Sequence, residues 1–241
     1  MDLRRFSTIA HSRHRFASPI SGARAAHLLA VVGVGKGTLV LDIGCGFGGW
    51  ASLAHEQGAV VTAVDPNNAF IDRGKARSPG ITWVNAEYAP ELVESGTQDV
   101  VLCIGSTHAL GGLEAVLAEA ARVLRKDGSV LIGEGFWKRP PDPDYLSVLG
   151  AEPDEMVSHA ANAERMSDAG WKVVYSTTAG ESEWDDYEGL YRHSIVHWLL
   201  ANASDPEAEA FRARSDTWYE TYLNMGRDTL GFGYYIAISA E

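Results

Sequence analysis

The sequence is poor in residues on which several large protein classes depend. Its 241 residues include two cysteines, Cys45 and Cys103, which are too few for a disulfide framework and lack the paired spacing of a metal site. Lys and Arg number 20 against 32 Asp and Glu, a formal net charge of −12, whereas nucleic-acid binding needs cations that neutralise phosphate. No apolar run reaches the ~18–20 residues of a membrane-spanning helix. We therefore expect a cytoplasmic protein with no resident metal, no nucleic-acid partner and no membrane partner.

What the sequence does have is glycine, and four of its 25 glycines cluster shortly after residue 40. The run Val40–Ala51, VLDIGCGFGGWA, passes from apolar residues into this cluster, which is the pattern of a strand that turns into a helix. Gly44, Gly46 and Gly49 match the G-x-G-x-x-G of dinucleotide-binding folds. The same run also fits D-x-G-x-G-x-G, beginning at Asp42. The glycines alone therefore leave two cofactor classes open.

Asp42 distinguishes these two cofactor classes. A dinucleotide would bring an anionic pyrophosphate to this turn, where the carboxylate would repel it. At ~4 Å and an effective dielectric near 20, such a pair of charges is worth about 4 kcal/mol, repulsive for pyrophosphate and attractive for an ammonium group. S-adenosylmethionine carries an ammonium and a sulfonium and no phosphate. Asp42 therefore favours that cofactor over a nicotinamide dinucleotide.

Two stretches of the sequence resemble a known enzyme family. The run VLDIGCGFGGWA is similar to the first motif of the class I S-adenosylmethionine-dependent methyltransferases, and ARVLRKDGSVLI, from Ala121 to Ile132, is similar to the helix that leads into their fifth strand. The segments EWDDYEGLY and GRDTLGFGYY, starting at Glu183 and Gly226, resemble a bacterial branch of small-molecule methyltransferases of the type 11/25 domain group. The resemblance implies methyl transfer from S-adenosylmethionine to a small molecule. It does not name that molecule.

The resemblance and the alternation of buried strands with helices imply an α/β fold. We expect a Rossmann-like, doubly wound, mostly parallel sheet of seven strands, with an antiparallel last strand and a helical insertion between strands six and seven. A chain of 241 residues with 46% hydrophobic content suits one domain with a single core. Its expected parts are an N-terminal arm and helix at 1–37, a cofactor-binding core at 38–178, a helical substrate cover at 179–230 and the last strand at 231–241.

Local patterns predict where several elements begin and end. Ser21 is expected to cap a helix. Lys126–Gly128 are expected to end the helix before strand five, and residues 140–153 to form a loop. In the insertion, Ser182 and Ser204 are expected to cap two helices. Strands are expected at 39–42, 60–64, 81–84, 98–106 with its exit, 171–175 and 231–239, with a further strand ending at 137.

The cofactor site is expected along the carboxyl ends of the first strands. Asp65 ends the second strand 21 residues after Gly44, where an acid is placed to bond ribose hydroxyls. The resemblance implies that adenine is bound at Asn85, where family members commonly carry Asp, so the acceptor oxygen is kept and the charge is lost. The residues predicted to bind S-adenosylmethionine are Asp42, Gly44, Cys45, Gly46, Asp65, Pro66, Asn85, Ala86, Glu87 and Cys103.

Methyl transfer from a sulfonium is an in-line displacement on a donor that is already activated. Holding the acceptor in line can supply ~7–11 kcal/mol. A general base adds about 10²- to 10⁴-fold, or roughly 3–5.5 kcal/mol, so positioning comes first. The predicted catalytic residues are His108 past the fourth strand and Glu134 past the fifth, with His193 and His197 as further candidates.

Substrate contacts are expected from the N-terminal arm and the insertion. The arm is rich in arginine, and Arg13 or Arg15 is expected to fold over the pocket and touch a carboxylate of the substrate or cofactor. Aromatic residues of the insertion repeat at helical spacing, a pattern that reflects packing more often than a ligand cage. The predicted substrate-binding residues are Arg15, Phe16, Trp137, Tyr187 and Tyr191.

Other functions remain open on the sequence alone. An NAD(P)-dependent oxidoreductase is favoured by Gly49 and Asp65 and disfavoured by Asp42. A non-catalytic S-adenosylmethionine-binding protein would keep the same glycine loop. A metal-dependent catechol-type mechanism is disfavoured, because Asp185 and Asp186 fall at a helix start, away from the strand exits. The expected partner is a small molecule, and a homodimer is one assembly that stays open.

Overall fold

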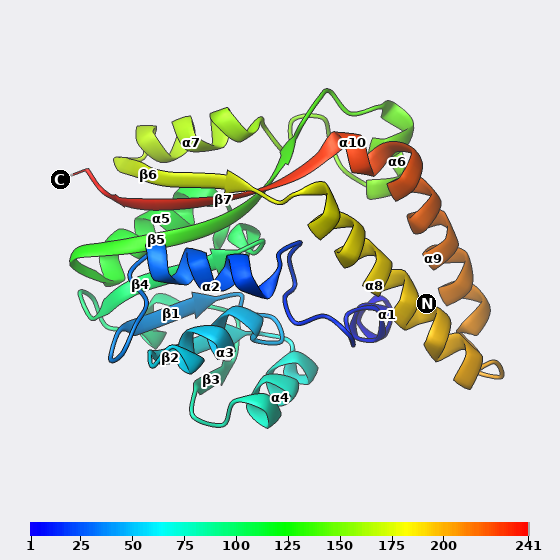
Figure 1. The fold of residues 1–241 in the computed structure, drawn as a ribbon, viewed down its shortest axis with the longest axis horizontal. Helices are drawn as coiled ribbons and strands as arrows, with labels where there is room; N and C mark the ends of the chain where they lie inside the picture. The colour runs from blue at the N-terminus through cyan, green and yellow to red at the C-terminus, as the bar shows by residue number, and fades with distance from the viewer. Residues whose placement is uncertain (241) are drawn as a thin grey trace.

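A seven-stranded sheet forms the centre of the computed structural model, which describes residues 1–240 (Figure 1). Its strand order is β3-β2-β1-β4-β5-β7-β6. Strands β1 to β5 run parallel, and β7 lies between β5 and β6, antiparallel to both. The predicted fold class is therefore confirmed. The strands are β1 Leu39–Ile43, β2 Val60–Asp65, β3 Thr82–Asn85, β4 Gln98–Ile104, β5 Leu124–Trp137, β6 Trp171–Thr178 and β7 Leu230–Ser239.

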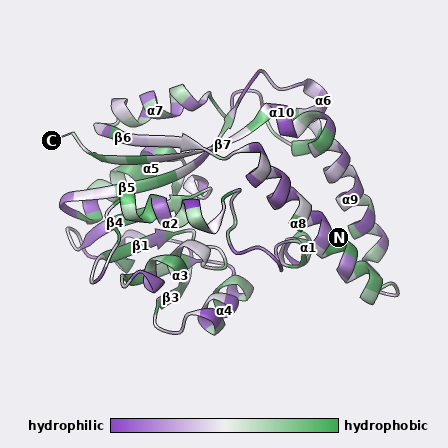
Figure 2. Cartoon of the chain, in the orientation of Figure 1, coloured by the Kyte–Doolittle hydropathy of each residue, from purple (hydrophilic) through white to green (hydrophobic). Residues whose placement is uncertain are grey.

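Helices cover both faces of the sheet because its central strands are apolar on both sides (Figure 2). One face is covered by α2 Gly22–Val31, α3 Gly49–Glu56 and α4 Asn68–Arg77, which share a buried cluster with β1 and β2. The other face is covered by α5 Leu113–Val123 and α7 His159–Asp168. Two 3₁₀ turns, Pro90–Leu92 and Thr107–Leu110, precede and follow β4.

Three helices pack together beyond one end of the sheet, and we call them the helical cap (Figure 1). They are α1 Leu3–Ala10, α8 Glu181–Ala201 and α9 Ala208–Thr221. Phe6 of α1 is buried against Ile195 of α8 and Phe211 of α9, so the start of the chain is part of the cap. A π-helical turn, Tyr222–Gly226, and the short α10, Arg227–Thr229, connect α9 to β7.

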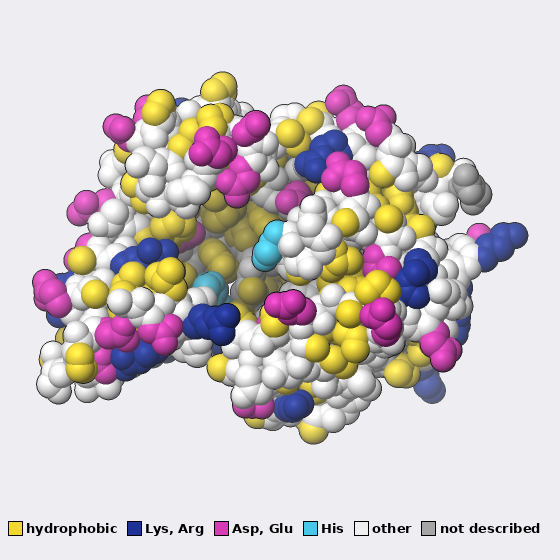
Figure 3. All heavy atoms as spheres, turned by 180° about the vertical axis from the view of Figure 1, so that it is seen from behind, with side chains coloured by type: hydrophobic (Ala, Val, Ile, Leu, Met, Phe, Trp, Pro, Cys, Tyr) yellow, Lys and Arg dark blue, Asp and Glu magenta, His cyan; other side chains and the backbone are white. Residues whose placement is uncertain are grey.

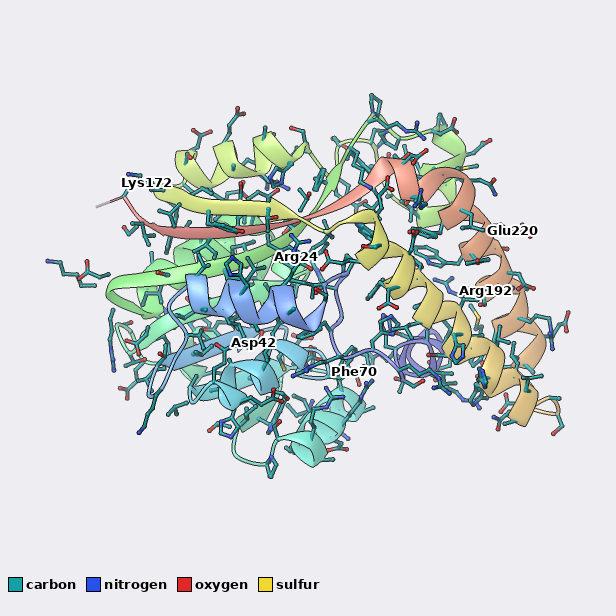
Figure 4. All side chains as sticks on the ribbon, in the orientation of Figure 1. Arg24, Asp42, Phe70, Lys172, Arg192 and Glu220 are labelled. Atoms are coloured by element: carbon teal, nitrogen blue, oxygen red, sulfur yellow. The ribbon has the colours of Figure 1, made fainter. Side chains whose placement is uncertain are left out.

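One ion-paired contact fixes the start of α8 against the sheet. Glu183 Oε2 accepts a hydrogen bond from the Gly180 amide at 3.0 Å, and its Oε1 accepts one from the Ser21 amide at 2.8 Å. Arg24, labelled in Figure 4, pairs with the same carboxylate and donates to Thr178 O at 3.0 Å. The carboxylate thus joins α2, β6 and α8 at one corner.

Several predicted boundaries are wrong. The expected loop at 140–153 contains α6, Pro143–Leu149, which Asp142 caps. Helix α5 ends at Val123, so Lys126–Gly128 lie within β5 instead of ending a helix. The N-cap residue of α8 is Gly180, two residues before Ser182, and the Glu183 side chain accepts a hydrogen bond from the Gly180 amide. The N-cap residue of α9 is Glu207, three residues after Ser204, and the Asp205 side chain accepts from the Glu207 amide.

Other boundaries agree with the sequence. Ser21 caps α2, its hydroxyl accepting from the Arg24 amide. Along residues 1–240, no helix is both long and apolar enough to cross a membrane.

Replacing Gly48 with Ala should lower the free energy of unfolding by about 2–4 kcal/mol, because Gly48 has a φ of 74° and an added Cβ would overlap the Trp83 ring. Urea unfolding monitored by circular dichroism measures the loss. Gly35→Ala is the matched control, since nothing lies within 4 Å of its added Cβ. Equal losses in the two variants would contradict the packing role of Gly48.

Candidate functional site

The loop from β1 to α3 is fixed by backbone hydrogen bonds to the end of β2. The amides of Gly44 and Cys45 both donate to Val64 O, at 2.9 and 3.0 Å. The amide of Gly46 donates to Asp65 Oδ2 at 2.9 Å. The loop and the predicted ribose-binding acid are therefore held against each other at the carboxyl ends of two neighbouring strands.

The glycines of this loop differ in what surrounds them. A Cβ on Gly44 would overlap Ser106, and a Cβ on Gly49 would overlap the Arg15 carbonyl group. Only Ala17, at 3.7 Å, would meet a Cβ on Gly46. Gly44 and Gly49 are thus needed for packing within the chain. A ligand can approach the backbone of Gly46, because little protein lies beside it.

Asp42 is a buried carboxylate without a partner for one of its oxygens. It lies in β1 between Ala63 of β2 and Leu102 of β4, and 2% of its surface is exposed. Within residues 1–240 no group donates a hydrogen bond to its Oδ2. Burial, together with the nearby charge of Asp65, raises the pKa of Asp42 to about 7. A cationic group at this position would supply the missing donor and stabilise the charged carboxylate, so the site fits the ammonium of S-adenosylmethionine.

Asp65 and Asn85 end neighbouring strands and are paired in register. Asp65 Oδ1 accepts from the Asn67 amide at 2.8 Å, and the Asn85 side chain donates to Asp65 O at 3.1 Å. A carboxylate has about four acceptor sites, so Asp65 retains capacity for further donors. Pro66 and Glu87 are exposed and Ala86 is half-buried at this same edge. The predicted adenosine-binding residues therefore lie together, and their role stays a prediction.

The two cysteines are enclosed by protein. The Cys45 thiol donates to Gly46 O at 3.5 Å, and the Cys103 sulfur lies 3.3 Å from the Ser106 hydroxyl. Burial raises the pKa of the Cys103 thiol to about 12, so it is no nucleophile at neutral pH. Any contact of these two residues with a cofactor would come from their backbone.

A cavity of about 520 Å³ opens at the exits of β4 and β5 and contains both predicted catalytic residues. Its walls include His108, Glu134, Arg165 and Phe232. Burial raises the pKa of Glu134, although a hydrogen bond from Thr107 acts in the opposite direction. Within residues 1–240, Glu134 Oε2 has no hydrogen-bond partner. A raised pKa makes the Glu134 carboxylate a stronger base than an exposed carboxylate, which suits general-base chemistry.

The surface above this region is hollowed between the sheet and the helical cap (Figure 3). Figure 3 shows hydrophobic side chains at the bottom of the hollow and histidine side chains at its edges. His108 is exposed, in the turn after β4. The further candidates His193 and His197 lie exposed on α8, with ring centroids 4.1 Å apart. Only His108 of these three therefore lies in the wall of the cavity that holds Glu134.

The N-terminal arm lies across the glycine loop. Arg73 of α4 donates to His11 O at 2.7 Å and to His14 O at 2.5 Å, which pins the arm. Phe16 is buried against Trp50. Arg15 does pair with a carboxylate, but it is Glu56 of α3, at 2.9 Å. The expected contact of Arg13 or Arg15 with a carboxylate of the substrate or cofactor stays a prediction.

The predicted aromatic substrate contacts have different surroundings. Tyr187 OH lies 3.0 Å from His11 Nε2, and Tyr191 packs edge-on against Phe6, so both join α8 to the arm. Trp137 is buried, packs with Tyr145 and donates to a backbone carbonyl at 3.0 Å. The Trp137 side chain thus lies in a small core with residues of α6, and its predicted contact with the substrate stays a prediction.

Two residues that shape the site were missed in the sequence. The Ser106 hydroxyl donates to Ile43 O at 2.8 Å and fills the space beside Gly44. Arg73 fixes the arm and lies 4.3 Å from the Phe47 ring centroid. Ser106 carried a signal, as a small polar residue next to Gly105 at a strand exit. Arg73 carried none, because its partners are backbone carbonyls about 60 residues away.

Within residues 1–240, no group of three or more His, Cys, Asp or Glu side chains is arranged to hold a metal ion. Asp185 instead accepts from Tyr222 OH at 2.6 Å and from Arg227 at 2.9 Å.

Comparison with known proteins gives matches in both sequence and structure. Residues 40–128 match the model of a methyltransferase domain. A methyltransferase from Geobacter sulfurreducens, solved with S-adenosyl-L-homocysteine, is 28% identical, with a TM-score of 0.90 and 99% of each chain covered. The uncharacterized protein YjhP of Escherichia coli is 27% identical over 99% of this chain and its own full length. A sterol 24-C-methyltransferase of Eremothecium gossypii is 33% identical over 68% of this chain and 48% of that protein.

These matches agree with the geometry of the site. The matched domain begins at the glycine loop and includes Asp42, Asp65 and Asn85. The predicted cofactor, S-adenosylmethionine, is confirmed over the nicotinamide alternative, and the predicted enzyme class is confirmed over a non-catalytic binding protein. By its matched domain, its full-length relatives and its glycine loop, the chain is a class I S-adenosylmethionine-dependent methyltransferase.

Proposed function

We propose that the acceptor is a small molecule with a largely apolar body, methylated in the cavity at the exits of β4 and β5. The observation that carries this proposal is the cavity itself, about 520 Å³, whose wall includes Glu134, a half-buried carboxylate with no partner within residues 1–240 for its Oε2. Pockets for small molecules generally measure ~300–1,000 Å³. The wall of this cavity combines polar and charged groups with the apolar side chains of Leu113, Met156 and Phe232, against which an apolar body can lie. The name of the sterol methyltransferase relative, which denotes an apolar acceptor, supports this proposal.

The residues at the glycine loop would hold the cofactor by charge and by hydrogen bonds. Asp42 would bind the ammonium group, and Asp65 the ribose hydroxyls. Asn85 and the Ala86 amide would bind the adenine. When bound, S-adenosylmethionine supplies an activated methyl group on a sulfonium. The arm, pinned by Arg73, would exclude water from this side of the site.

The chain contributes to methyl transfer mainly by positioning. A fixed orientation is worth ~7–11 kcal/mol, more than a base alone supplies. Glu134 would take the proton from an acceptor hydroxyl or amine, because its raised pKa makes it a better base than an exposed carboxylate. His108 at the exposed rim would help to orient the acceptor.

Binding of S-adenosylhomocysteine should strengthen with rising pH. Asp42 has a pKa of about 7 in the free protein and must be charged to bind an ammonium group, so binding below pH 7 releases a proton. The association constant should therefore rise about 100-fold from pH 5 to pH 8. Isothermal titration calorimetry in buffers of different ionisation enthalpy measures both the affinity and the proton released.

Asp42→Asn should flatten this pH dependence and weaken binding at pH 8. The matched control is Asp168→Asn, at an exposed position on α7, which should keep the wild-type profile. A pH dependence that persists in Asp42→Asn would assign the titrating group elsewhere.

Glu134→Gln should lower kcat about 100-fold or more while leaving the affinity for S-adenosylhomocysteine within twofold, because the amide cannot accept the acceptor proton. Turnover is measured as S-adenosylhomocysteine production on a panel of hydroxylated and amine acceptors. Glu220→Gln on the outer surface of α9 is the control (Figure 4). Full turnover by Glu134→Gln would show that positioning alone suffices.

A further inference from the structure

A second, much smaller cavity lies inside the helical cap, between α6, α8, α9 and the start of β7. Its volume is about 10 Å³, which is room for about one water-sized group. Aromatic rings form most of its wall, and a single carboxylate completes it. The side chains that argue for its role are Tyr145, Trp184, Glu188, Trp218, Tyr222 and Leu230.

Two of the buried polar side chains in this wall point to a ligand, and one of them lacks a partner. Glu188 is 5% exposed, and its Oε2 accepts a hydrogen bond from Trp218 Nε1 at 2.7 Å. Trp184 is 7% exposed, and within residues 1–240 no group accepts from its indole N–H. Most buried donors in proteins are paired, so an unpaired one beside a cavity points to a bound group. Burial also raises the pKa of Glu188 to about 7, although the hydrogen bond from Trp218 acts in the opposite direction.

The chemistry of these two groups selects what fits between them. The indole N–H of Trp184 needs an acceptor, and the carboxylate of Glu188, which already accepts from Trp218, has capacity to accept from a further donor. An ammonium has no lone pair to accept from the indole. A carboxylate or phosphate has no proton to donate and would be repelled by Glu188. A hydroxyl both accepts and donates, and its single heavy atom matches a water-sized cavity.

We propose that this cavity is the far end of the acceptor site and binds a hydroxyl group of the acceptor, which Trp184 and Glu188 recognise. This inference rests on the proposed function and adds a substrate class to it. The acceptor is a largely apolar molecule with a hydroxyl remote from the atom that receives the methyl group.

Strand β7 connects this cavity to the one that contains Glu134. Leu230 lies in the wall of the small cavity and Phe232 in the wall of the large one. Two residues apart on a strand, they share one face and lie about 7 Å from each other. Both pack against the same apolar cluster. An apolar body lying across these two side chains would reach from the polar end at Trp184 to the methyl-transfer end at Glu134.

The test uses the indole N–H resonances of the full-length protein saturated with S-adenosylhomocysteine. The chain has seven tryptophans, and Trp184→Phe identifies the Trp184 resonance. The probes are 2-naphthol and 2-methylnaphthalene, which have similar shapes and differ in the hydroxyl. We expect 2-naphthol to shift the Trp184 resonance, to remove any contact of its N–H with bound water, and to bind about 5-fold more tightly than 2-methylnaphthalene.

Variants at the two recognising residues should remove this preference. Trp184→Phe keeps the ring without the N–H, and Glu188→Gln keeps the shape without the charge; each should reduce the ratio of the two affinities to below twofold. Trp171→Phe, in the core on the other face of the sheet, and Glu220→Gln, exposed on α9, are matched controls that should keep the wild-type ratio.

Three outcomes would overturn the inference: equal binding of both probes, a Trp184 resonance that neither probe shifts, or a water contact that persists with 2-naphthol bound. The last outcome would make the cavity a structural water site. A different measurement tests the proposed function itself. If S-adenosylhomocysteine leaves the Gly46 amide resonance unchanged, the cofactor assignment fails whatever the probes do.

Discussion

The rest of the structure depends on a buried carboxylate that the chain itself does not neutralise. Asp42 lies near the carboxyl end of β1, between β2 and β4. One of its oxygens has no donor within residues 1–240, and Asp65 adds a second negative charge nearby. Because its pKa is raised from 3.8 to about 7, the folded protein retains a proton that the unfolded chain releases. Stability without ligand therefore falls as the pH rises from about 4 to 7. A bound cation stabilises the ionised carboxylate of Asp42 and so offsets this loss of stability. Cofactor binding therefore stabilises the folded protein.

The surroundings of Asp42 are held rigid by contacts from distant parts of the chain. Ser106 joins the β4 exit to the backbone of β1, and Trp83 packs over Gly48. Arg73 holds the arm from the opposite side. A charge placed in such a rigid site cannot relax toward water, so its interaction with a ligand cation is stronger than the same pair would be at the surface. The tight packing of the glycine loop therefore strengthens the interaction of Asp42 with a ligand cation.

The elements that the sequence predicted well are those set by local patterns. β1, β2 and β4 are apolar runs buried on both faces, and their ends agree with the prediction within two residues. The acid at 65 meets the glycine loop because the parallel register requires it. The helix at 3–10 was missed because its stability comes from packing on α8 and α9. The glycine spacing was read as room for a ligand, whereas Gly44 and Gly49 also accommodate Ser106 and Arg15, contacts that no local pattern encodes.

The acidic residues of the chain divide into two groups by their partners. Glu183, Glu119 and Asp205 are each paired with an arginine and hold secondary structure together, and their pKa values are lowered. Asp42 and Glu188 are buried and Glu134 is half-buried; none of the three has an ion pair within residues 1–240, and burial raises the pKa of all three. These three lie, in turn, at the glycine loop, in the cavity past β5 and inside the helical cap. A fold selected for stability alone would pair such charges or replace them with apolar residues. We propose that ligand groups contact these three carboxylates.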